Sequence, residues 1–147
     1  MERYTLGQVS IWFVLDANYD LGKYFNWKNI MKHFNLSEFD SPDFPNSGIN
    51  MDKKFLLKID TAREIAGVPF KITSGYRTKE QNQKVGGVIG SSHTKGHAAD
   101  VHCNNSVSRF TIVNSLLKAG FNRIGIADTF IHVDDDPDKV KDVIWTY

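Results

Sequence analysis

Three of the five histidines of the chain lie in one short stretch, Ser91–His102, which reads SSHTKGHAADVH. An aspartate, Asp100, stands among them, and a glycine comes midway. Imidazole and carboxylate groups are ligands of Zn²⁺, and a catalytic zinc site usually has three protein ligands and one position open to water. Zinc lowers the pKa of that water to about 7, which supplies hydroxide at neutral pH. The stretch is therefore either part of a metal site or a polar loop rich in histidine.

The second half of the stretch is predicted as a strand, and this geometry selects two candidate ligands. Residues two apart share one face of a strand, so Asp100 shares its face with His102, whereas His97 points to the other face. Gly96 permits a tight bend before the strand, and His93 can therefore fold back over the face of Asp100. One carboxylate and one imidazole result.

A third ligand must come from another part of the chain, where the remaining histidines are His33 and His132. His132 lies in a predicted strand between Ile131 and Val133. Its neighbours point to a core on the opposite face, which indicates an occupied site on its own face. The spacing alone leaves a metal site and a structural or surface cluster of histidines equally open.

Three helices that would position these residues are predicted from their caps and apolar spacing. The first spans residues 52–66, and Gly67 suits its C-terminal cap. The second is short and begins with a capping box formed by Thr78 and Gln81. The third spans residues 108–119. Apolar residues at helical spacing are expected to face the core, namely Phe55, Leu56, Ile59, Ala62 and Ala66 in the first helix and Phe110, Val113, Leu116 and Leu117 in the third.

Short strands are expected around these helices. They are residues 70–74, 98–101, 123–126, 130–134 and 144–147. Helices and strands do not alternate regularly, which favours an α+β fold with a small mixed or antiparallel sheet and flanking helices over a doubly wound α/β fold. Nearer the N-terminus, Ser10–Leu15 suits a strand and Asn26 suits the cap of a short helix that runs through His33.

The composition fits one globular domain. The chain has 147 residues, of which 41% are apolar, and one domain is the expectation at this length. Its formal charge of +1 does not indicate a nucleic acid or an anionic membrane as partner. Its single cysteine, Cys103, excludes a disulfide within the chain and is expected to be a small buried residue.

The N-terminal residues indicate neither a membrane span nor a secretory signal. The longest apolar run, Ile11–Leu15, is far shorter than the roughly 20 residues of a transmembrane helix. No basic segment precedes an apolar stretch, and no small-residue cleavage site follows. Synthesis in the cytoplasm without a signal peptide is therefore expected for the chain as given.

A series of motifs occurs in an order that characterises one family of enzymes. The series is Ser74-Gly75-Tyr76-Arg77, Ser91-x-His93-x-x-Gly96-x-Ala98-x-Asp100, Phe130-Ile131-His132-Val133-Asp134 and a late Trp145. It resembles the zinc D-alanyl-D-alanine carboxypeptidases and the related L-alanyl-D-glutamate endopeptidases, over about residues 33–147. These enzymes cut the stem peptides of bacterial peptidoglycan, and some serve as phage endolysins. The resemblance implies their hedgehog-like α+β fold, as one zinc peptidase-like domain over residues 1–147 with residues 1–32 as an N-terminal extension.

The resemblance also implies roles for five residues. His93, Asp100 and His132 would bind Zn²⁺. Arg77 matches an arginine that contacts the carbonyl or carboxylate of the substrate, a role that suits the fork geometry and permanent charge of a guanidinium group. Ser91 matches a serine beside the site, where it would contact the substrate or support a ligand through a hydrogen bond.

One position departs from the family pattern. Many members carry a glutamate or aspartate as the general base three residues before the last zinc histidine, and here that position is Thr129. Asp134 lies two residues after His132 on the same strand face, about 6.6 Å along it, whereas Asp128 lies roughly 13 Å away in a continuous strand. Asp134 is therefore favoured as the catalytic carboxylate, with support of a ligand as its other role. Asp128 qualifies if residues 127–129 form a turn.

The expected function is zinc-dependent hydrolysis of peptidoglycan stem peptides, at the bacterial wall after phage-type lysis or as part of a phage particle. The alternative is a module of the same fold that binds the wall or builds a phage particle without catalysis, because Thr129 replaces the usual base. A metal-free structural protein comes third. The protein is expected to be a monomer, and loops such as residues 40–50 and 104–107 are expected to decide between the D-Ala-D-Ala and L-Ala-D-Glu bonds. His97 and His102 have no place in the pattern.

Overall fold

A computed structural model of the protein describes residues 2–6, 9–13 and 31–147. At the N-terminus, β1 (Glu2–Leu6) and β2 (Val9–Phe13) pair in antiparallel orientation. The predicted strand from Ser10 overlaps β2, and its last two residues lie outside the described residues. Most of the predicted helix from Asn26 also lies outside them, and residues 31–33 are not helical.

A mixed sheet of five strands forms the centre of the part that follows. Its order is β3-β4-β6-β5-β7, and every neighbouring pair is antiparallel except β5 and β7, which are parallel. The strands are β3 (Ile72–Ser74), β4 (Ala98–His102), β5 (Arg123–Ile126), β6 (Phe130–Asp134) and β7 (Val143–Thr146). This arrangement confirms the predicted α+β fold with a small mixed sheet. The five strands of this sheet lie where the sequence predicts them, although β3 is shorter than the predicted strand over residues 70–74.

Three α-helices and three short 3₁₀ helices accompany this sheet. They are η3 (Leu36–Phe39), η4 (Ser47–Asn50), α1 (Lys53–Ala66), α2 (Lys79–Lys84), η5 (Ser92–Lys95) and α3 (Ser106–Lys118). The predicted C-terminal cap of α1 is confirmed, whereas only one half of the predicted capping box of α2 forms, because the backbone N–H of Thr78 donates to the Ser41 hydroxyl at 3.2 Å. Gly67 ends α1 in the left-handed conformation, with φ of 64°, and the Thr78 hydroxyl accepts a hydrogen bond from the backbone N–H of Gln81 at 3.0 Å.

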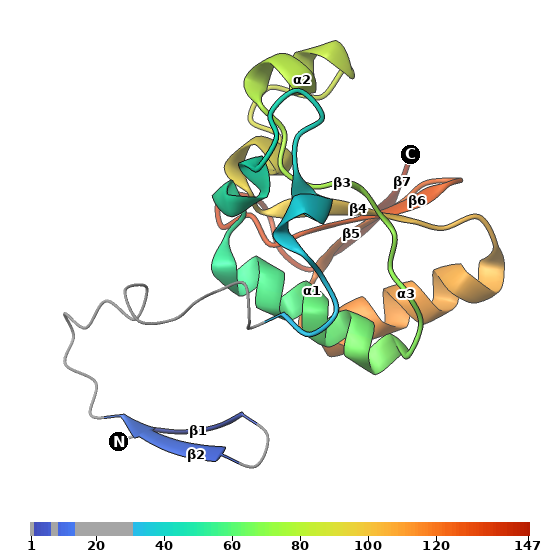
Figure 1. The fold of residues 1–147 in the computed structure, drawn as a ribbon. Coiled ribbons are helices and arrows are strands. Elements are labelled where there is room, and N and C mark those ends of the chain that lie inside the picture. The colour runs from blue at the N-terminus through green and yellow to red at the C-terminus, as the bar shows by residue number, and fades with distance from the viewer. Residues whose placement is uncertain (1, 7–8, 14–30) are drawn as a thin grey trace.

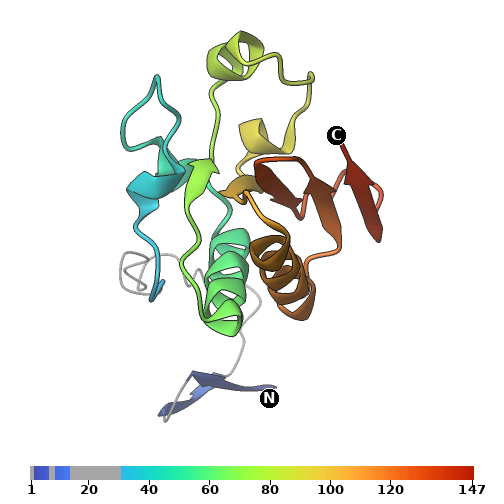
Figure 2. The same cartoon turned by 90° about the vertical axis from the view of Figure 1, so that its right-hand side faces the viewer.

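Helices α1 and α3 lie side by side against one face of the sheet (Figures 1 and 2). Alternate strand residues point to this face and form the core with the helices. The buried set includes Phe55, Ile59, Ala99, Val101, Ile112, Leu116, Ile124, Ile131 and Val133. Because strand side chains alternate between faces, the residues between them, such as Asp100 and His132, point to the opposite face of the sheet.

The predicted inward face of the third helix is wrong in part. Phe110 is 72% exposed and Leu117 is 45% exposed, whereas Ile112, Ser115 and Leu116 are buried. The buried face of this helix includes a serine. A prediction that uses only the spacing of apolar residues therefore does not find this face. Ser115 is accommodated there because its hydroxyl donates a hydrogen bond to the carbonyl of Ile112, one turn earlier, at 2.8 Å.

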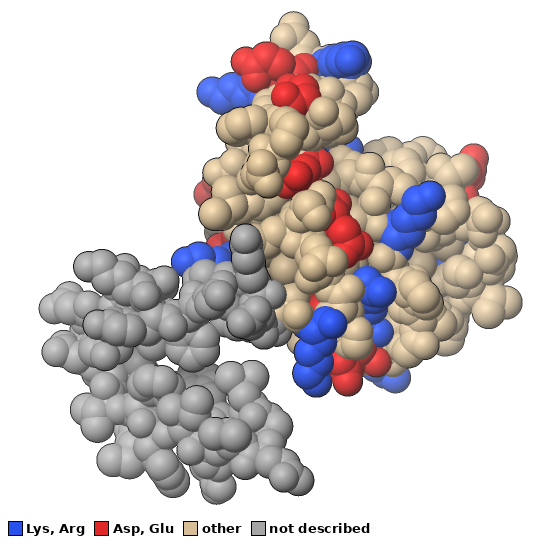
Figure 3. Space-filling view, in the orientation of Figure 1, with Lys and Arg blue, Asp and Glu red and all other residues tan. Residues whose placement is uncertain are grey.

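Neither sign of charge forms a continuous patch on the face of the molecule that Figure 3 shows. Acidic and basic side chains are interspersed among neutral ones over the described part of this face. Such a surface lacks the clustered lysines and arginines that mark a nucleic-acid-binding face, and it agrees with the small net charge of the chain.

Candidate metal centre and its cavity

Two candidate ligands lie opposite each other on the central strands of the sheet. Asp100 of β4 pairs in register with His132 of β6. Their side chains point to the face away from the two long helices, and Asp100 Oδ1 is 2.9 Å from His132 Nδ1. The register of an antiparallel pair therefore brings together two residues that are distant in sequence.

The third candidate ligand, His93, comes from η5, which lies over the same face of the sheet. Its Nε2 is 3.3 Å from Asp100 Oδ1 and 3.3 Å from His132 Nδ1. The Ser91 hydroxyl caps η5 by accepting a hydrogen bond from the backbone N–H of His93. Gly96 ends it with φ of 75°, and a side chain there would lie 2.2 Å from a backbone oxygen of η4. The predicted bend at this glycine therefore exists.

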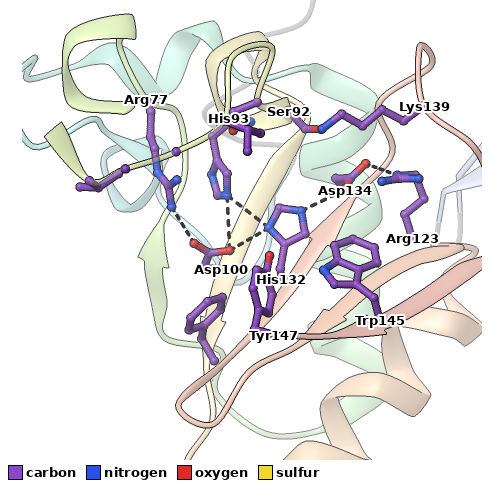
Figure 4. A pocket seen from close by; sticks show the side chains of 16 residues that line it. Arg77, Ser92, His93, Asp100, Arg123, His132, Asp134, Lys139, Trp145 and Tyr147 are labelled. Atoms are coloured by element: carbon purple, nitrogen blue, oxygen red, sulfur yellow. Dashed lines mark hydrogen bonds and ion pairs between the residues drawn. The ribbon is translucent and has the colours of Figure 1, made fainter. Parts of the chain in front are cut away.

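Hydrogen bonds on the far side of each imidazole ring orient its free nitrogen toward the cluster, and Figure 4 shows the one between His132 and Asp134. His93 Nδ1 lies 2.7 Å from the carbonyl oxygen of Gly75, so it carries the proton and donates. His132 Nε2 lies 3.0 Å from Asp134 Oδ2. With these protons placed, the two remaining ring nitrogens and a carboxylate oxygen of Asp100 face one another, within 4.8 Å.

Three facing acceptor atoms require a cation between them, which is either a shared proton or a metal ion. Two imidazoles and one carboxylate form a donor set that catalytic zinc sites use. The protons donated to a carbonyl and to a carboxylate fix each ring, as is usual for histidines that bind a metal. His93, Asp100 and His132 therefore fit a zinc ion.

The pKa values of the three residues agree with a site built for a cation. Burial lowers the pKa of His93 below its ordinary value. Burial alone would raise the pKa of Asp100, but hydrogen bonds with His132 and His93 outweigh it and lower the pKa. Burial also opposes a charge on His132, yet its hydrogen bonds to Asp100 and Asp134 raise its pKa. The hydrogen bonds around His132 therefore favour a positive charge at this position, whereas burial disfavours one on His93.

Arg77 and Ser91 both line the cavity in front of the cluster. Arg77 donates from Nη2 to Asp100 Oδ2 at 2.8 Å and from Nε to the Ser74 hydroxyl at 2.7 Å. The guanidinium group therefore holds the carboxylate oxygen that faces away from the two histidines. Ser91 is buried and uses its hydroxyl within the cap of η5.

The structure places the two predicted catalytic carboxylates differently. Asp134 is buried and lines the cavity, but Oδ1 accepts from Arg123 Nε at 2.7 Å and Oδ2 lies against His132. This geometry supports orientation of His132, and proton transfer by Asp134 stays a prediction. Residues 127–129 do form a turn, closed by a hydrogen bond from the Ala127 N–H to the Phe130 carbonyl. Asp128 is nevertheless exposed and does not line the cavity.

The cavity has a volume of about 510 Å³, and aromatic side chains line it beside the cluster. Trp145 lies 5.6 Å from His132, and Tyr147 lies 5.5 Å from Phe130, between ring centroids. A glycine makes room for the indole, because a side chain at Gly125 would lie 2.7 Å from the Trp145 ring. The part of the cavity wall that Phe130, Trp145 and Tyr147 form is therefore largely apolar.

Sequence reasoning missed several residues of this cavity, among them Ser92, Arg123, Lys139 and Tyr147. A signal existed for Arg123, because a charged residue in an otherwise apolar strand is rarely buried without a partner. No comparable signal marks Lys139, which lies in the loop after β6, or Tyr147, which follows β7.

The other histidines lie outside the cluster. His33 Nε2 is 2.5 Å from Glu64 Oε2, so the structure does not bring this alternative third ligand to the site. His97 pairs with Asp135 at 3.0 Å and His102 is exposed. Both lie away from the cluster, as predicted.

The comparison with protein families agrees with the fold and the site. Residues 32–134 match the family model of peptidase M15. The match covers more than half of the chain and includes all three residues of the cluster, so the chain belongs to the peptidase M15 family. Membership of this family supports a peptidase, and the family suggests a metallopeptidase that acts on peptidoglycan. No curated protein matches the chain.

None of the described helices has the length and apolar character that a membrane span requires.

Proposed function

We propose that the protein is a zinc-dependent peptidase that cuts a peptide bond in the stem peptides of bacterial peptidoglycan. One observation carries the proposal. His93, Asp100 and His132 bring three possible ligand atoms within 4.8 Å of one another in the lining of a cavity, in a chain of the peptidase M15 family. The resemblance to phage endolysins supports action at the cell wall, after lysis or from a phage particle.

In this proposal, His93, Asp100 and His132 hold the zinc ion. A bound zinc ion polarises the carbonyl of the substrate and makes a bound water acidic. Arg77, beside Asp100, binds the carbonyl or carboxylate of the substrate through donors that its two intramolecular hydrogen bonds leave free. Ser91 fixes the position of His93 through the cap of η5.

Asp134 serves this site first as a positioning residue. It accepts a hydrogen bond from His132 and is itself held by Arg123. Among the described residues that line the cavity, Asp100 and Asp134 are the only carboxylates. A proton acceptor from the protein would therefore have to be Asp134, after its Oδ2 atom leaves His132. We assign no catalytic role to Asp128.

Digestion of purified muropeptides, followed by mass spectrometry, tests this function and identifies the bond that is cut. The zinc-loaded protein should release a stem-peptide fragment, and a chelator should abolish the release. His93→Ala should reduce cutting below detection, whereas His102→Ala, which changes an exposed histidine outside the cluster, should retain it. The proposal is wrong if the zinc-loaded protein cuts no stem peptide, or if His93→Ala cuts as well as the unmodified protein.

A binding module of the same fold is the second candidate. Thr129 favours it, because the family's usual carboxylate is absent at that position and Asp134 is engaged by two hydrogen bonds. Binding of zinc and of muropeptides without any turnover in the same digestion would select this function.

A further inference from the structure

The cavity contains one more positive than negative side chain. Its acidic residues are each paired with an arginine, Asp100 with Arg77 at 2.8 Å and Asp134 with Arg123 at 2.7 Å. Lys139 also lines the cavity, and no hydrogen bond or ion pair joins its ammonium group to any described residue. A metal ion at the cluster would add further positive charge. The cavity therefore complements an anionic group, and Lys139 is the lining cation for which the described residues provide no partner.

The loop that carries Lys139 is anchored close to the cluster. Asp136, three residues earlier, is fully buried, and it accepts hydrogen bonds from the Ser92 hydroxyl at 3.0 Å and from Lys95 Nζ at 3.2 Å. The backbone N–H of Lys139 donates to the carbonyl of Asp136 at 3.3 Å. These bonds tie the loop to η5, which also carries His93. The backbone of Lys139 is thus held in place relative to η5.

Arg77 and Lys139 reach the cavity from different elements. In Figure 4 the two side chains lie on either side of His93, Arg77 beside β3 and Lys139 from the loop after β6. Arg77 uses two of its donors to hold Asp100 and Ser74, whereas the ammonium group of Lys139 forms no hydrogen bond or ion pair within the described part of the chain. A substrate that spans the cluster can therefore meet one cation on each side.

The D-Ala-D-Ala and L-Ala-D-Glu bonds, which are the two expected cleavage sites, share one chemical feature. In a D-Ala-D-Ala terminus, the residue that leaves as an amine carries the free C-terminal carboxylate. In the L-Ala-D-Glu bond of a stem peptide, the D-Glu residue continues through its γ-carboxyl group, so its α-carboxylate is free. In both cases a carboxylate lies on the carbon next to the scissile nitrogen, and a cation in the lining of the same cavity can pair with it.

We propose that Lys139 is a specificity-determining residue that binds this free α-carboxylate on the leaving side of the scissile bond. The inference rests on the proposed function and adds a chemical criterion for the substrate. Stem peptides with a free carboxylate at this position are substrates, and those in which it is an amide are poor ones. A charge-assisted hydrogen bond between ammonium and carboxylate is lost with the amide, which has no negative charge.

The test compares pairs of peptides that differ only in this group. One pair is a stem peptide ending in D-Ala-D-Ala and its C-terminal amide, and the other contains D-Glu or its α-amide. The zinc-loaded protein should prefer the free acid in kcat/KM by about tenfold or more. Lys139→Gln should reduce this ratio to about one, and Lys139→Arg should restore most of it. Lys141→Gln is the matched control, because Lys141 is exposed in the same loop and does not line the cavity.

A binding measurement separates this proposal from the proposed function. Calorimetry with the zinc-loaded protein gives the dissociation constants of the acid and amide peptides whether or not they are cut. A preference for the acid that disappears in Lys139→Gln supports the role of Lys139, even if no peptide is cut and the proposed function is wrong. Equal binding and cutting of acid and amide, or a preference that survives Lys139→Gln, would overturn the proposal.

Discussion

Asp100 and His132 stand in register on adjacent antiparallel strands, with 2.9 Å between Oδ1 and Nδ1. Both strands lie inside the sheet and are held by pairing on either side, so the distance between the two side chains is set by rigid elements. His93 is the one member of the cluster that comes from outside the sheet. A site on strands is positioned more precisely than one on loops, and metal affinity should therefore depend on the groups that orient the rings.

Zinc affinity should fall at acid pH because of His132. Its pKa is raised above the ordinary value of 6.5, since hydrogen bonds to Asp100 and Asp134 outweigh burial. The protonated His132 ring must lose the proton on the nitrogen that faces the cluster before it can bind zinc. The affinity for zinc therefore reaches its maximum only at pH values above the raised pKa of His132. Below it, affinity should fall about tenfold per pH unit. Competition with a chelator across this range measures the effect, and an affinity that stays constant down to about pH 5.5 would contradict it.

The variant Asp134→Asn should weaken zinc binding. The carboxylate of Asp134 accepts the proton that fixes the ring of His132, and loss of such a partner typically costs about 10- to 100-fold in metal affinity. Zinc competition measures the change, and a melting curve checks that the variant is folded. Asp138→Asn is the control, because Asp138 is largely exposed. Equal zinc affinities for the two variants would show that Asp134 does not support the ligand.

The variant Gly125→Ala should destabilise the protein through Trp145. An added Cβ would lie 2.7 Å from Cε2 and 2.8 Å from Cζ2 of the indole, so the ring must move. Overpacking of this kind costs about 1–3 kcal/mol in the free energy of unfolding, which urea denaturation measures. The same substitution in a Trp145→Ala background should cost much less. If the cost is the same in both backgrounds, the indole is not its cause.

The variant Asp136→Ala should loosen the loop that follows β6. Asp136 is fully buried and accepts hydrogen bonds from Ser92, Lys95 and the backbone N–H of Asp138. Its removal leaves buried donors without partners, at a cost of about 1–3 kcal/mol in the free energy of unfolding. Asp138→Ala, at an exposed position, should stay within about 0.5 kcal/mol. A similar loss in both variants would argue against an anchoring role for Asp136.

The sequence alone determined the elements that local chemistry specifies. The N-terminal cap at Thr78 and the C-terminal cap at Gly67 are confirmed because a cap depends on a few neighbouring residues. The same holds for the bend at Gly96, where only a residue without a side chain fits. The buried face of α3 was predicted wrongly in part, because Ser115 interrupts the apolar stripe and its burial depends on contact with other elements.

The sequence also indicated which residue types could bind a metal, through the spacing of His93 and Asp100 and the motif order that places His132 late in the chain. Only the tertiary structure decided which nitrogen of each ring faces the cluster, since that depends on Gly75 and Asp134 as acceptors. It also decided that Asp128 lies outside the cavity and that Lys139 lines it. Periodicity and motifs report local geometry, whereas the direction of a hydrogen bond and the lining of a cavity arise where distant segments pack together.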